Sequence, residues 1–330
     1  MKAISVRNNT LHDTDLPLPQ ALGRDLVVQV EAISVNPVDH KLRNAPAAGD
    51  ASRVLGFDVA GTVTAVGPDA TLFKVGDQVY YAGSAVRQGA NSQFHAVDER
   101  IVGHRPASLG AAQAAALPLT SITAWEALFD RLGVAKDGSD AGKSLLVIGG
   151  AGGVGSIAIQ LAKKLARLTV VATASRTVSA DWCRALGADH IVDHNGDIPA
   201  QLAALGLPAV DFILCLNETD KHFPAMAAAV APQGKICSIV GNEAPLALEA
   251  LFSKSATLVW ELMFTRSMFG TPDMIEQHRL LDDVARLVDA GVLRTTVGEL
   301  FGKINAANLT RAHEALEGRR TIGKIVLAGF

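Results

Sequence analysis

Apolar and polar residues alternate in short runs along the N-terminal part of the chain, for example over residues 26–32. Gly, Pro and Asp residues separate these runs up to about Val102, and Val is frequent within them. Alternation with a period of two, interrupted by turn-forming residues, is typical of strands. The pattern predicts a β-rich barrel or sandwich, followed from Ala111 by an alanine-rich helical stretch.

The pattern changes after Lys143, where short apolar runs alternate with helical patterns. The expected strands are 144–148, 168–173, 190–192, 210–215, 234–240 and 256–260. Strands that alternate with helices indicate a parallel, doubly wound sheet. The C-terminal part returns to an extended segment at 295–301, a helix near 308–316 and a strand at 323–327. We therefore expect an α/β protein.

A glycine-rich turn connects the strand 144–148 to a helix expected over 156–165. Gly150, Gly152 and Gly155 fit the pattern G-x-G-x-x-G. In that pattern the glycines allow a tight turn, the approach of a pyrophosphate to the backbone, and close packing of helix on strand. The helix N-terminus then offers free N–H groups to the phosphates. A turn that needs glycine only for packing is the alternative. The residues expected at the cofactor are Gly150, Ala151, Gly152, Gly153, Val154 and Gly155.

The end of the next strand selects the form of the cofactor. An NAD site usually has an acidic residue there, which binds the ribose 2′-hydroxyl. This chain has Ser175 and Arg176 after the strand 168–173, and no carboxylate. A hydroxyl and a guanidinium suit a 2′-phosphate, so we expect NADPH. The alternative is that Arg176 is a solvated surface residue beside an NAD site.

Composition excludes several other classes of protein. The chain has 330 residues, of which 49% are hydrophobic and 19% charged, and its net charge is −3. This balance predicts a globular protein without a nucleic-acid surface. No apolar run reaches the ~18 residues of a membrane span, and the N-terminus lacks the apolar core of a signal peptide. Cys183, Cys215 and Cys237 follow no metal or disulfide spacing. We expect a cytoplasmic protein.

Three further segments carry a family resemblance: ISVNPVD at 33–39, LGFDVAGTV at 55–63 and FKVGDQV at 73–79. With the glycine motif, they make the whole chain resemble the medium-chain dehydrogenase/reductase superfamily, in its zinc-free quinone oxidoreductase-like branch. The resemblance implies a GroES-like β-barrel catalytic domain over 1–118 and 266–330. It also implies an NADP-binding Rossmann domain over 119–265.

Zinc enzymes of this superfamily hold a catalytic metal with a Cys, a His and another Cys or Asp. By the resemblance, these ligand positions fall here on Asn36, Phe57 and near Leu119. No cysteine precedes Cys183, so the family's four-cysteine lobe is also missing. His40, His95 and His104 have no ligand spacing. We therefore expect no metal, and a zinc-type label for this chain would describe its ancestry.

A chain without zinc lacks the Lewis acid that activates an alcohol. Reduction of a quinone or an α,β-unsaturated carbonyl is easier, because hydrogen-bond donors or water stabilise the negative oxygen. The expected catalytic residues are Asn36, beside the nicotinamide, and Lys41, as a donor or anion stabiliser where relatives often have Tyr. Asn36 is otherwise a turn residue, and Lys41 a surface lysine paired with Asp39 or Asp58. Asp58 is either a site residue or a buried structural acid.

Further cofactor contacts follow from the resemblance. Thr123 matches a position at the nicotinamide end, and His194 stands where relatives have a Tyr near the adenosine phosphate. The alternatives are a helix-surface threonine and an exposed loop histidine. Lys324 belongs to a recurrent tail motif and is expected near the cofactor, or else at a barrel edge. The ends of two parallel strands face the cofactor as well, and they contribute Leu216, Asn217, Val240, Gly241 and Asn242.

These inferences predict an NADPH-dependent reductase of quinones or similar carbonyl acceptors. An enal/enone reductase acting on C=C is one alternative, and a non-catalytic NADPH-binding sensor or structural protein is another. Residues 256–264 are apolar and β-prone, and they lie near the end of the expected sheet. An uncovered strand edge of this kind favours pairing. We therefore expect a homodimer, unless the chain's own helices cover that strand.

Overall fold

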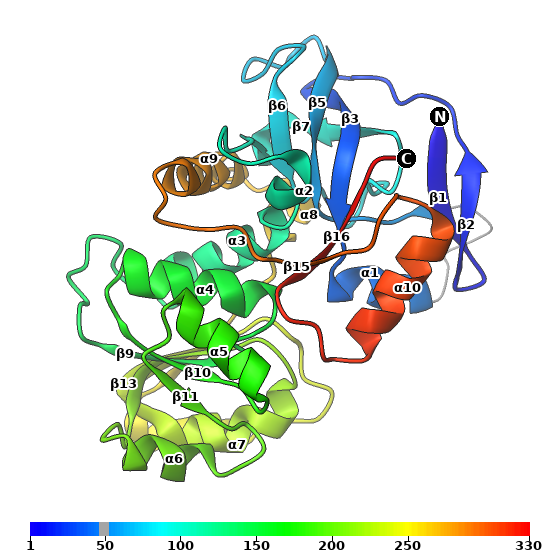
Figure 1. The fold of residues 1–330 in the computed structure, drawn as a ribbon. Helices are drawn as coiled ribbons and strands as arrows, with labels where there is room; N and C mark the ends of the chain where they lie inside the picture. Colours follow the sequence, from blue (N-terminus) through cyan, green and yellow to red (C-terminus); the bar gives the residue numbers. More distant parts are fainter. Residues whose placement is uncertain (46–52) are drawn as a thin grey trace. The chain divides into compact units, whose positions relative to one another are not determined.

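A computed structural model describes residues 1–45 and 53–330 of the chain (Figure 1). The chain divides into two compact units. Residues 1–122 and 264–330 form the first, called here the antiparallel unit. Residues 123–263 form the second, called the parallel-sheet unit. Both ends of the chain therefore build one unit, and its middle builds the other.

The described strands of the antiparallel unit form two sheets. The small sheet has the order β2-β1-β4, and the large sheet has the order β15-β16-β3-β5-β6-β8, with β7 also paired to β3. The strands are β1 (Lys2–Arg7), β2 (Thr10–Asp15), β3 (Asp25–Ser34), β4 (Arg53–Val54), β5 (Val59–Val66), β6 (Gln78–Tyr81), β7 (Phe94–Asp98), β8 (Val102–His104), β15 (Val297–Leu300) and β16 (Lys324–Ala328). The C-terminal strand β16 thus joins the N-terminal strand β3 antiparallel.

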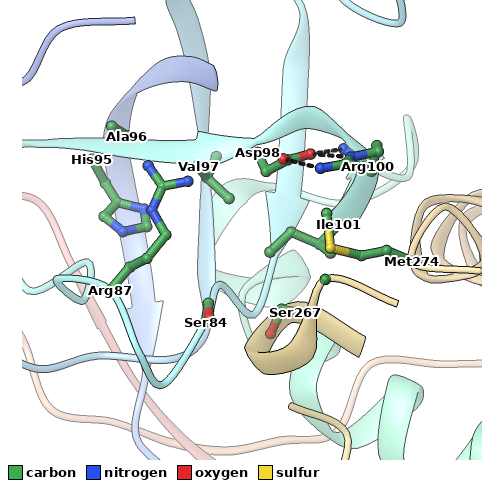
Figure 2. Close-up of a pocket in the computed structure, with 11 residues that line it drawn as sticks. Ser84, Arg87, His95, Ala96, Val97, Asp98, Arg100, Ile101, Ser267 and Met274 are labelled. Carbon is green, nitrogen blue, oxygen red and sulfur yellow. Dashed lines mark hydrogen bonds and ion pairs between the residues drawn. The ribbon is translucent and has the colours of Figure 1, made fainter. Parts of the chain in front are cut away.

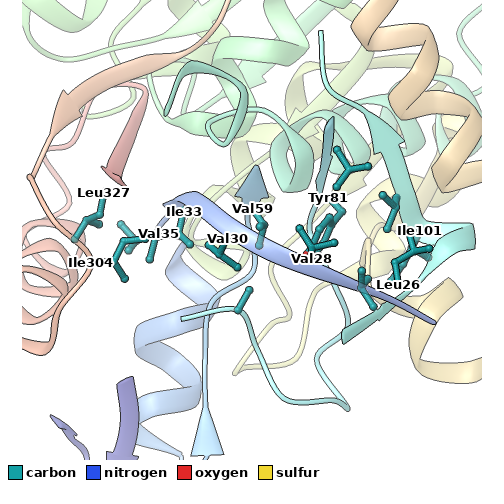
Figure 3. Packing of buried hydrophobic residues seen from close by; sticks show 14 of the residues in the cluster. Leu26, Val28, Val30, Ile33, Val35, Val59, Tyr81, Ile101, Ile304 and Leu327 are labelled. Carbon is teal, nitrogen blue, oxygen red and sulfur yellow. The ribbon is translucent and has the colours of Figure 1, made fainter. Parts of the chain in front are cut away.

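Strand β3 is the centre of the large sheet, because β5, β7 and β16 all pair with it. Its apolar residues and those of neighbouring strands form one buried cluster, which Figure 3 shows around Val28, Val30 and Ile33. The β3–β5 pairing leaves no room for a side chain at Gly61. A Cβ there would lie 2.1 Å from the carbonyl oxygen of Gln29. Glycine at this position is therefore a packing requirement.

Short helices surround these sheets. They are α1 (Pro37–Asn44), the 3-10 turn η1 (Glu99–Ile101), α2 (Ala111–Ala114), α8 (Thr265–Phe269), α9 (Glu276–Asp289) and α10 (Ala306–Glu317). Helix α3 (Pro118–Trp125) contains the boundary between the two units. The buried hydroxyl of Tyr80 on β6 donates a 2.6 Å hydrogen bond to the carbonyl oxygen of Leu281 on α9. This contact ties α9 to the large sheet.

The structure describes every residue of the parallel-sheet unit, whose sheet has six parallel strands in the order β11-β10-β9-β12-β13-β14. The elements are η2 (Glu126–Arg131), β9 (Ser144–Ile148), α4 (Gly153–Lys164), β10 (Thr169–Thr173), α5 (Thr177–Leu186), β11 (His190–Val192), α6 (Ile198–Ala204), β12 (Val210–Cys215), α7 (Thr219–Ala229), β13 (Val230–Ser238), η3 (Leu248–Lys254) and β14 (Thr257–Trp260). Figure 1 shows α4 and α5 on one face of the sheet and α6 and α7 on the other. The expected doubly wound parallel sheet is confirmed.

Several element boundaries differ from those expected. The helix after the glycine motif begins at Gly153 and not at residue 156, so the last three motif residues form its first turn. Strand β13 begins at Val230, and β14 ends at Trp260. Residues 261–264 therefore extend beyond the edge strand. None of the helices in the described part of the chain is long and apolar enough to cross a membrane.

Candidate functional site

The chain order of the parallel sheet creates a switch point between β9 and β12. The strands run outward from β9 to β10 and β11, and the chain then returns to place β12 on the other side of β9. Ligands of doubly wound folds bind at the carboxyl ends of the strands beside such a point. The glycine motif lies at the carboxyl end of β9. The topology therefore places the motif where a dinucleotide is expected.

The glycines of this loop have different physical roles. Gly149, one residue before the motif, makes the left-handed turn, with a φ of +88°. A Cβ on Gly155 would lie 2.5 Å from the carbonyl oxygen of Gly150, and a Cβ on Gly150 would lie 2.8 Å from the Cβ of Ala172. Gly150 and Gly155 are therefore packing positions. The turn role, expected at the first motif glycine, belongs to Gly149, because Gly150 sits against β10.

Gly152 differs from these because the space beside it is open. It is the N-terminal cap residue of α4, and a Cβ there would meet only the carbonyl oxygen of Gly149, at 3.6 Å. The first turn of α4, including Gly153 and Val154, presents backbone N–H groups to this space, and Ala151 lies just before it. Such a cradle fits the pyrophosphate of a dinucleotide. The residues present therefore fit a nicotinamide cofactor.

Ser175 and Arg176 lie between the end of β10 and the start of α5. Ser175 is exposed and Arg176 is half-buried. The Ser179 hydroxyl accepts a hydrogen bond from the backbone N–H of Arg176 at 3.2 Å and donates one to its carbonyl at 2.8 Å. The strand end thus presents a hydroxyl and a guanidinium from an ordered turn. These groups are complementary to a phosphate.

His194 follows β11 and is half-buried, whereas the alternative to a cofactor contact was an exposed loop histidine. Among the residues that the structure describes, its buried Nδ1 atom has no hydrogen-bond partner. His222, on the first turns of α7, is 3% exposed, and within the same described residues its Nε2 atom also lacks a partner. Burial lowers the pKa of His222, and Lys221 and His194 lower it further. Sequence reasoning missed His222, because its burial depends on how α7 packs.

A pair of hydroxyl groups joins the start of α7, which follows β12, to the carboxyl end of β13. The Thr219 and Ser238 hydroxyls lie 2.6 Å apart, and the Thr219 hydroxyl donates to the carbonyl oxygen of Val240 at 2.5 Å. Asp220 accepts from the backbone N–H groups that follow Asn242. These contacts shape the predicted cofactor loop. The exposed or half-buried residues at these strand ends are Leu216, Asn217, Val240, Gly241 and Asn242.

Thr123 is buried on α3, with 4% of its surface exposed, so it is not a helix-surface threonine. Lys41 lies in the last turn of α1 and is exposed. Lys41 is therefore a cation that solvent can reach. Asp58, one of its two candidate partners, pairs with Lys324 instead.

Asn36, Asp58 and Lys324 come together inside the antiparallel unit. The Lys324 ammonium donates to Asp58 Oδ2 at 2.8 Å, to the carbonyl oxygen of Val35 at 2.9 Å, and to Asn36 Oδ1. The Asn36 amide nitrogen donates to Asp58 Oδ2 at 2.8 Å. Burial raises the pKa of Asp58, and Lys324 opposes this rise. Lys324 is thus neither a surface lysine nor an edge lysine.

Asp39 is the second acid of this region. Its two carboxylate oxygens accept from the backbone N–H groups of Asn36, at 2.7 Å, and Gly56, at 3.0 Å. Burial raises the pKa of Asp39 to about 7, while these N–H donors and Lys324 lower it. Asp39 and Asp58 therefore position the segments before α1 and β5. The sequence suggested both acids as possible partners of Lys41. In the structure Asp39 accepts from backbone N–H groups, and Asp58 pairs with Lys324.

The residues at the expected zinc positions do not fit a metal. Phe57 is buried, and its ring packs edge-on against Phe264, with ring centroids 5.2 Å apart. Leu119 has no ligating side chain, and both ends of the Asn36 amide are engaged. Zinc needs N, S or carboxylate ligands. Across residues 1–45 and 53–330, no group of three or more His, Cys, Asp or Glu residues has metal-binding geometry.

The three histidines near these segments each contact a different group. His95 lies 3.0 Å from the Tyr81 hydroxyl and 2.8 Å from the carbonyl oxygen of Gln88. His104 pairs with Asp282 at 3.1 Å, and His40 lies 3.9 Å from Glu317. Burial lowers the pKa of His95 to about 4, so this side chain is neutral at physiological pH.

The antiparallel unit also contains a cavity of about 130 Å³, which Figure 2 shows between Arg87, Ser84 and Met274. Arg87 pairs with Asp25 through two hydrogen bonds, and Arg100 pairs with Asp98. The positive charges in its wall are thus already neutralised.

Known families match most of the chain. The model of the alcohol dehydrogenase GroES-like domain matches residues 23–123, and the model of zinc-binding dehydrogenases matches residues 186–327. A zinc-type alcohol dehydrogenase-like protein of Staphylococcus aureus is 44% identical over 312 residues, which are 94% of this chain and 92% of the relative. The human mitochondrial NAD(P)H oxidoreductase RTN4IP1 is 30% identical over 84% of this chain and 75% of the relative.

Solved structures share the fold along the whole chain. A Rhizobium etli protein described as a zinc-dependent alcohol dehydrogenase is 50% identical, covers 100% of this chain and 98% of its own, and has a TM-score of 0.96. A quinone oxidoreductase of Pseudomonas syringae is 27% identical, covers 99% of both chains, and has a TM-score of 0.83. The mycobacterial protein Rv1454c complexed with NADPH is 27% identical over 99% of both chains, with a TM-score of 0.85.

These matches confirm the fold expected from the sequence, a GroES-like domain together with a Rossmann-like parallel sheet. They also agree with the glycine cradle at Gly152, which fits a nicotinamide cofactor. The chain therefore belongs to the medium-chain dehydrogenase/reductase superfamily and is an oxidoreductase of that family.

Proposed function

We propose that the chain is an NADPH-dependent oxidoreductase that reduces a quinone or another electron-poor carbonyl acceptor without zinc. One observation carries this proposal: an open dinucleotide cradle at Gly152 occurs in a chain with Asn36, Phe57 and Leu119 at the metal positions. NAD(P)H oxidoreductases and quinone oxidoreductases among the similar proteins support it.

The cofactor, when bound, supplies the hydride, and the chain's own residues bind, orient and stabilise charge. The N-terminus of α4 holds the pyrophosphate, and Ser175 and Arg176 hold the 2′-phosphate. In this proposal the adenosine end lies near His194, and Thr123 and the strand ends at Leu216 and Val240 contact the rest of the cofactor. Lys324 acts on this site through the Asn36 amide, to which its buried ammonium donates.

On the acceptor side, we assign Asn36 and Lys41. The exposed ammonium of Lys41 donates hydrogen bonds to the acceptor oxygen as negative charge develops on it. The Asn36 amide is held by Lys324 and Asp58, and Asn36 is only 2% exposed. In this proposal Asn36 therefore fixes the segment before α1 beside the nicotinamide, and the hydrogen bonds to the acceptor come from Lys41. Apolar groups at Phe57 and Leu119 suit a flat, hydrophobic acceptor better than a small alcohol.

The acceptor class is tested by a substrate panel. The purified chain is expected to oxidise NADPH with 1,4-quinones and enones, and to be poor at oxidising primary alcohols with NADP. Product analysis separates the alternatives, because a quinone gives a hydroquinone whereas an enone gives a saturated C=C bond. Efficient alcohol oxidation with no acceptor reduction would overturn the proposal. NADPH binding without turnover of any acceptor would favour the sensor or structural alternative.

Arg176→Ala is expected to weaken NADPH binding and to affect NADH much less. A lost hydrogen bond to a charged group costs roughly 1.5–3 kcal/mol, which corresponds to roughly a 10- to 150-fold change in the dissociation constant. Calorimetric titration of both cofactors measures this difference. Arg184→Ala is the matched control, since Arg184 lies on the same helix and pairs with Asp181 at 2.9 Å. Equal affinities of the parent chain for NADH and NADPH would show that Arg176 does not select the cofactor.

Gly152→Val and Gly155→Val separate binding from packing. The space beside Gly152 is open, so Gly152→Val is expected to keep the melting temperature within a few degrees and to abolish cofactor binding. Gly155→Val places atoms against the Gly150 carbonyl, so it is expected to lower the melting temperature as well. Differential scanning fluorimetry and cofactor titration give both readouts. Full NADPH binding by Gly152→Val would contradict a pyrophosphate at this cradle.

The homodimer expected from the sequence remains part of this proposal. Strand β14 is at one end of the sheet. Its last residue, Trp260, is 43% exposed, and Leu262 just after it is 50% exposed. A dimer is expected by light scattering at micromolar concentration, and Trp260→Lys is expected to shift it toward monomer. Leu205→Lys, an exposed apolar position after α6, is the control. A monomeric parent chain at that concentration would refute the pairing.

A further inference from the structure

The three positions that the family resemblance relates to zinc ligands join one hydrogen-bond network in this chain. Asn36 joins it through its side chain, whereas Phe57 and Leu119 join it through backbone atoms. Asn36 accepts from the Lys324 ammonium and donates to Asp58 Oδ2 at 2.8 Å. The carbonyl oxygen of Phe57 accepts from the Asn36 amide at 3.1 Å. The backbone N–H of Leu119 donates to Asp58 Oδ1 at 2.8 Å. A cation, Lys324, therefore lies at the centre of the network that these three positions share.

The coordination of this cation is complete. An ammonium has three N–H donors, and Lys324 directs them at Asp58 Oδ2, the carbonyl oxygen of Val35 and Asn36 Oδ1. The lysine side chain is 4% exposed and the Asp58 side chain 0% exposed. A buried charge without a partner is strongly unfavourable. The ammonium therefore holds its three acceptors in place. The acceptors in turn stabilise the buried positive charge.

The network also joins segments that are far apart in the chain. Lys324 comes from β16, Asn36 precedes α1, Asp58 precedes β5, and Leu119 lies in the first turn of α3. The Asn36 side-chain amide bridges the two charged groups, and the Leu119 N–H donates to the carboxylate of the pair. All of these residues belong to the antiparallel unit. The arrangement needs no contribution from the other unit.

We propose that Lys324 is a built-in cation that replaces the metal ion as the positioning group of this site. It fixes the amide of Asn36, the carboxylate of Asp58 and, through Asp58, the start of α3. The network is then complete without an ion, because the ammonium supplies the positive charge at its centre. This proposal concerns the protein's own site and stands independently of the acceptor and of the cofactor preference.

Chemical rescue tests this assignment. Lys324→Ala removes the ammonium and leaves three oxygen acceptors facing a cavity. We expect a clear fall in the melting temperature, restored in a concentration-dependent way by propylammonium. Tetramethylammonium, which has no N–H donors, and propanol, which has no charge, are expected to give no comparable recovery. A Lys324→Ala variant with an unchanged melting temperature, or equal recovery with propanol, would overturn the proposal.

Lys254→Ala is the matched control. The Lys254 ammonium also donates to three carbonyl oxygens, those of Ala227, Ala228 and Val230, but no carboxylate takes part. Propylammonium is therefore expected to stabilise this variant no more than the parent chain. Preferential recovery of Lys324→Ala thus reports the ion pair, whereas equal recovery of both variants would count against it.

Removing both charges gives a second test, in case Lys324→Ala fails to fold. The variant Lys324→Met with Asp58→Asn leaves no buried unpaired carboxylate. It is expected to melt at a higher temperature than Lys324→Met alone, and the two changes are expected to be non-additive. Additive losses would contradict the pairing. Metal analysis of the parent chain is expected to find no stoichiometric zinc, and about one tightly bound zinc per chain would refute replacement of the metal.

Discussion

The buried pair of Lys324 and Asp58 is the interaction on which the candidate site depends. A lysine ammonium and a carboxylate are stable inside a protein only when each finds its full set of partners. Here the partners are the Val35 carbonyl and the Asn36 amide, from the segment before α1, and the Leu119 N–H, from α3. The two charges themselves come from β16 and from the segment before β5. The requirement to satisfy one ion pair therefore fixes the relative positions of four strands and helices. Asn36 has its defined orientation for this reason, since both ends of its amide are used.

The glycine loop imposes a second constraint, on the packing around β9 and on the space beside α4. Its glycines have two different roles. Gly150 and Gly155 allow β9, β10 and α4 to approach one another, whereas Gly152 keeps a space open at the helix N-terminus. A loop built only for packing would have no use for that open space. The distinction between the two kinds of glycine links the fold of the sheet to the binding of a phosphate.

The descriptions of the relatives mention zinc, but the side chains at the corresponding positions of this chain do not fit a metal. Several relatives carry zinc in their descriptions, and one family model describes zinc-binding dehydrogenases. In this chain, however, a phenyl ring, an aliphatic side chain and an engaged amide stand at the ligand positions. A shared fold conserves the segments that surround a site, while single substitutions within them change its chemistry. The description of the relatives therefore does not transfer to the site of this chain.

The sequence by itself determined the class of fold, the dinucleotide motif and the family, because period-two alternation, strand–helix alternation and glycine spacing are local patterns. It also identified Asn36, Asp58 and Lys324 individually. Only the tertiary structure decided that these three residues meet, since they lie up to 288 positions apart and no local pattern connects them. The same holds for His222, whose burial depends on how α7 packs, and for Gly149, whose left-handed turn follows from the crowding of Gly150 against β10. Buried charges that pair over a long sequence separation meet only in the folded chain. Local sequence patterns therefore cannot predict such a pair.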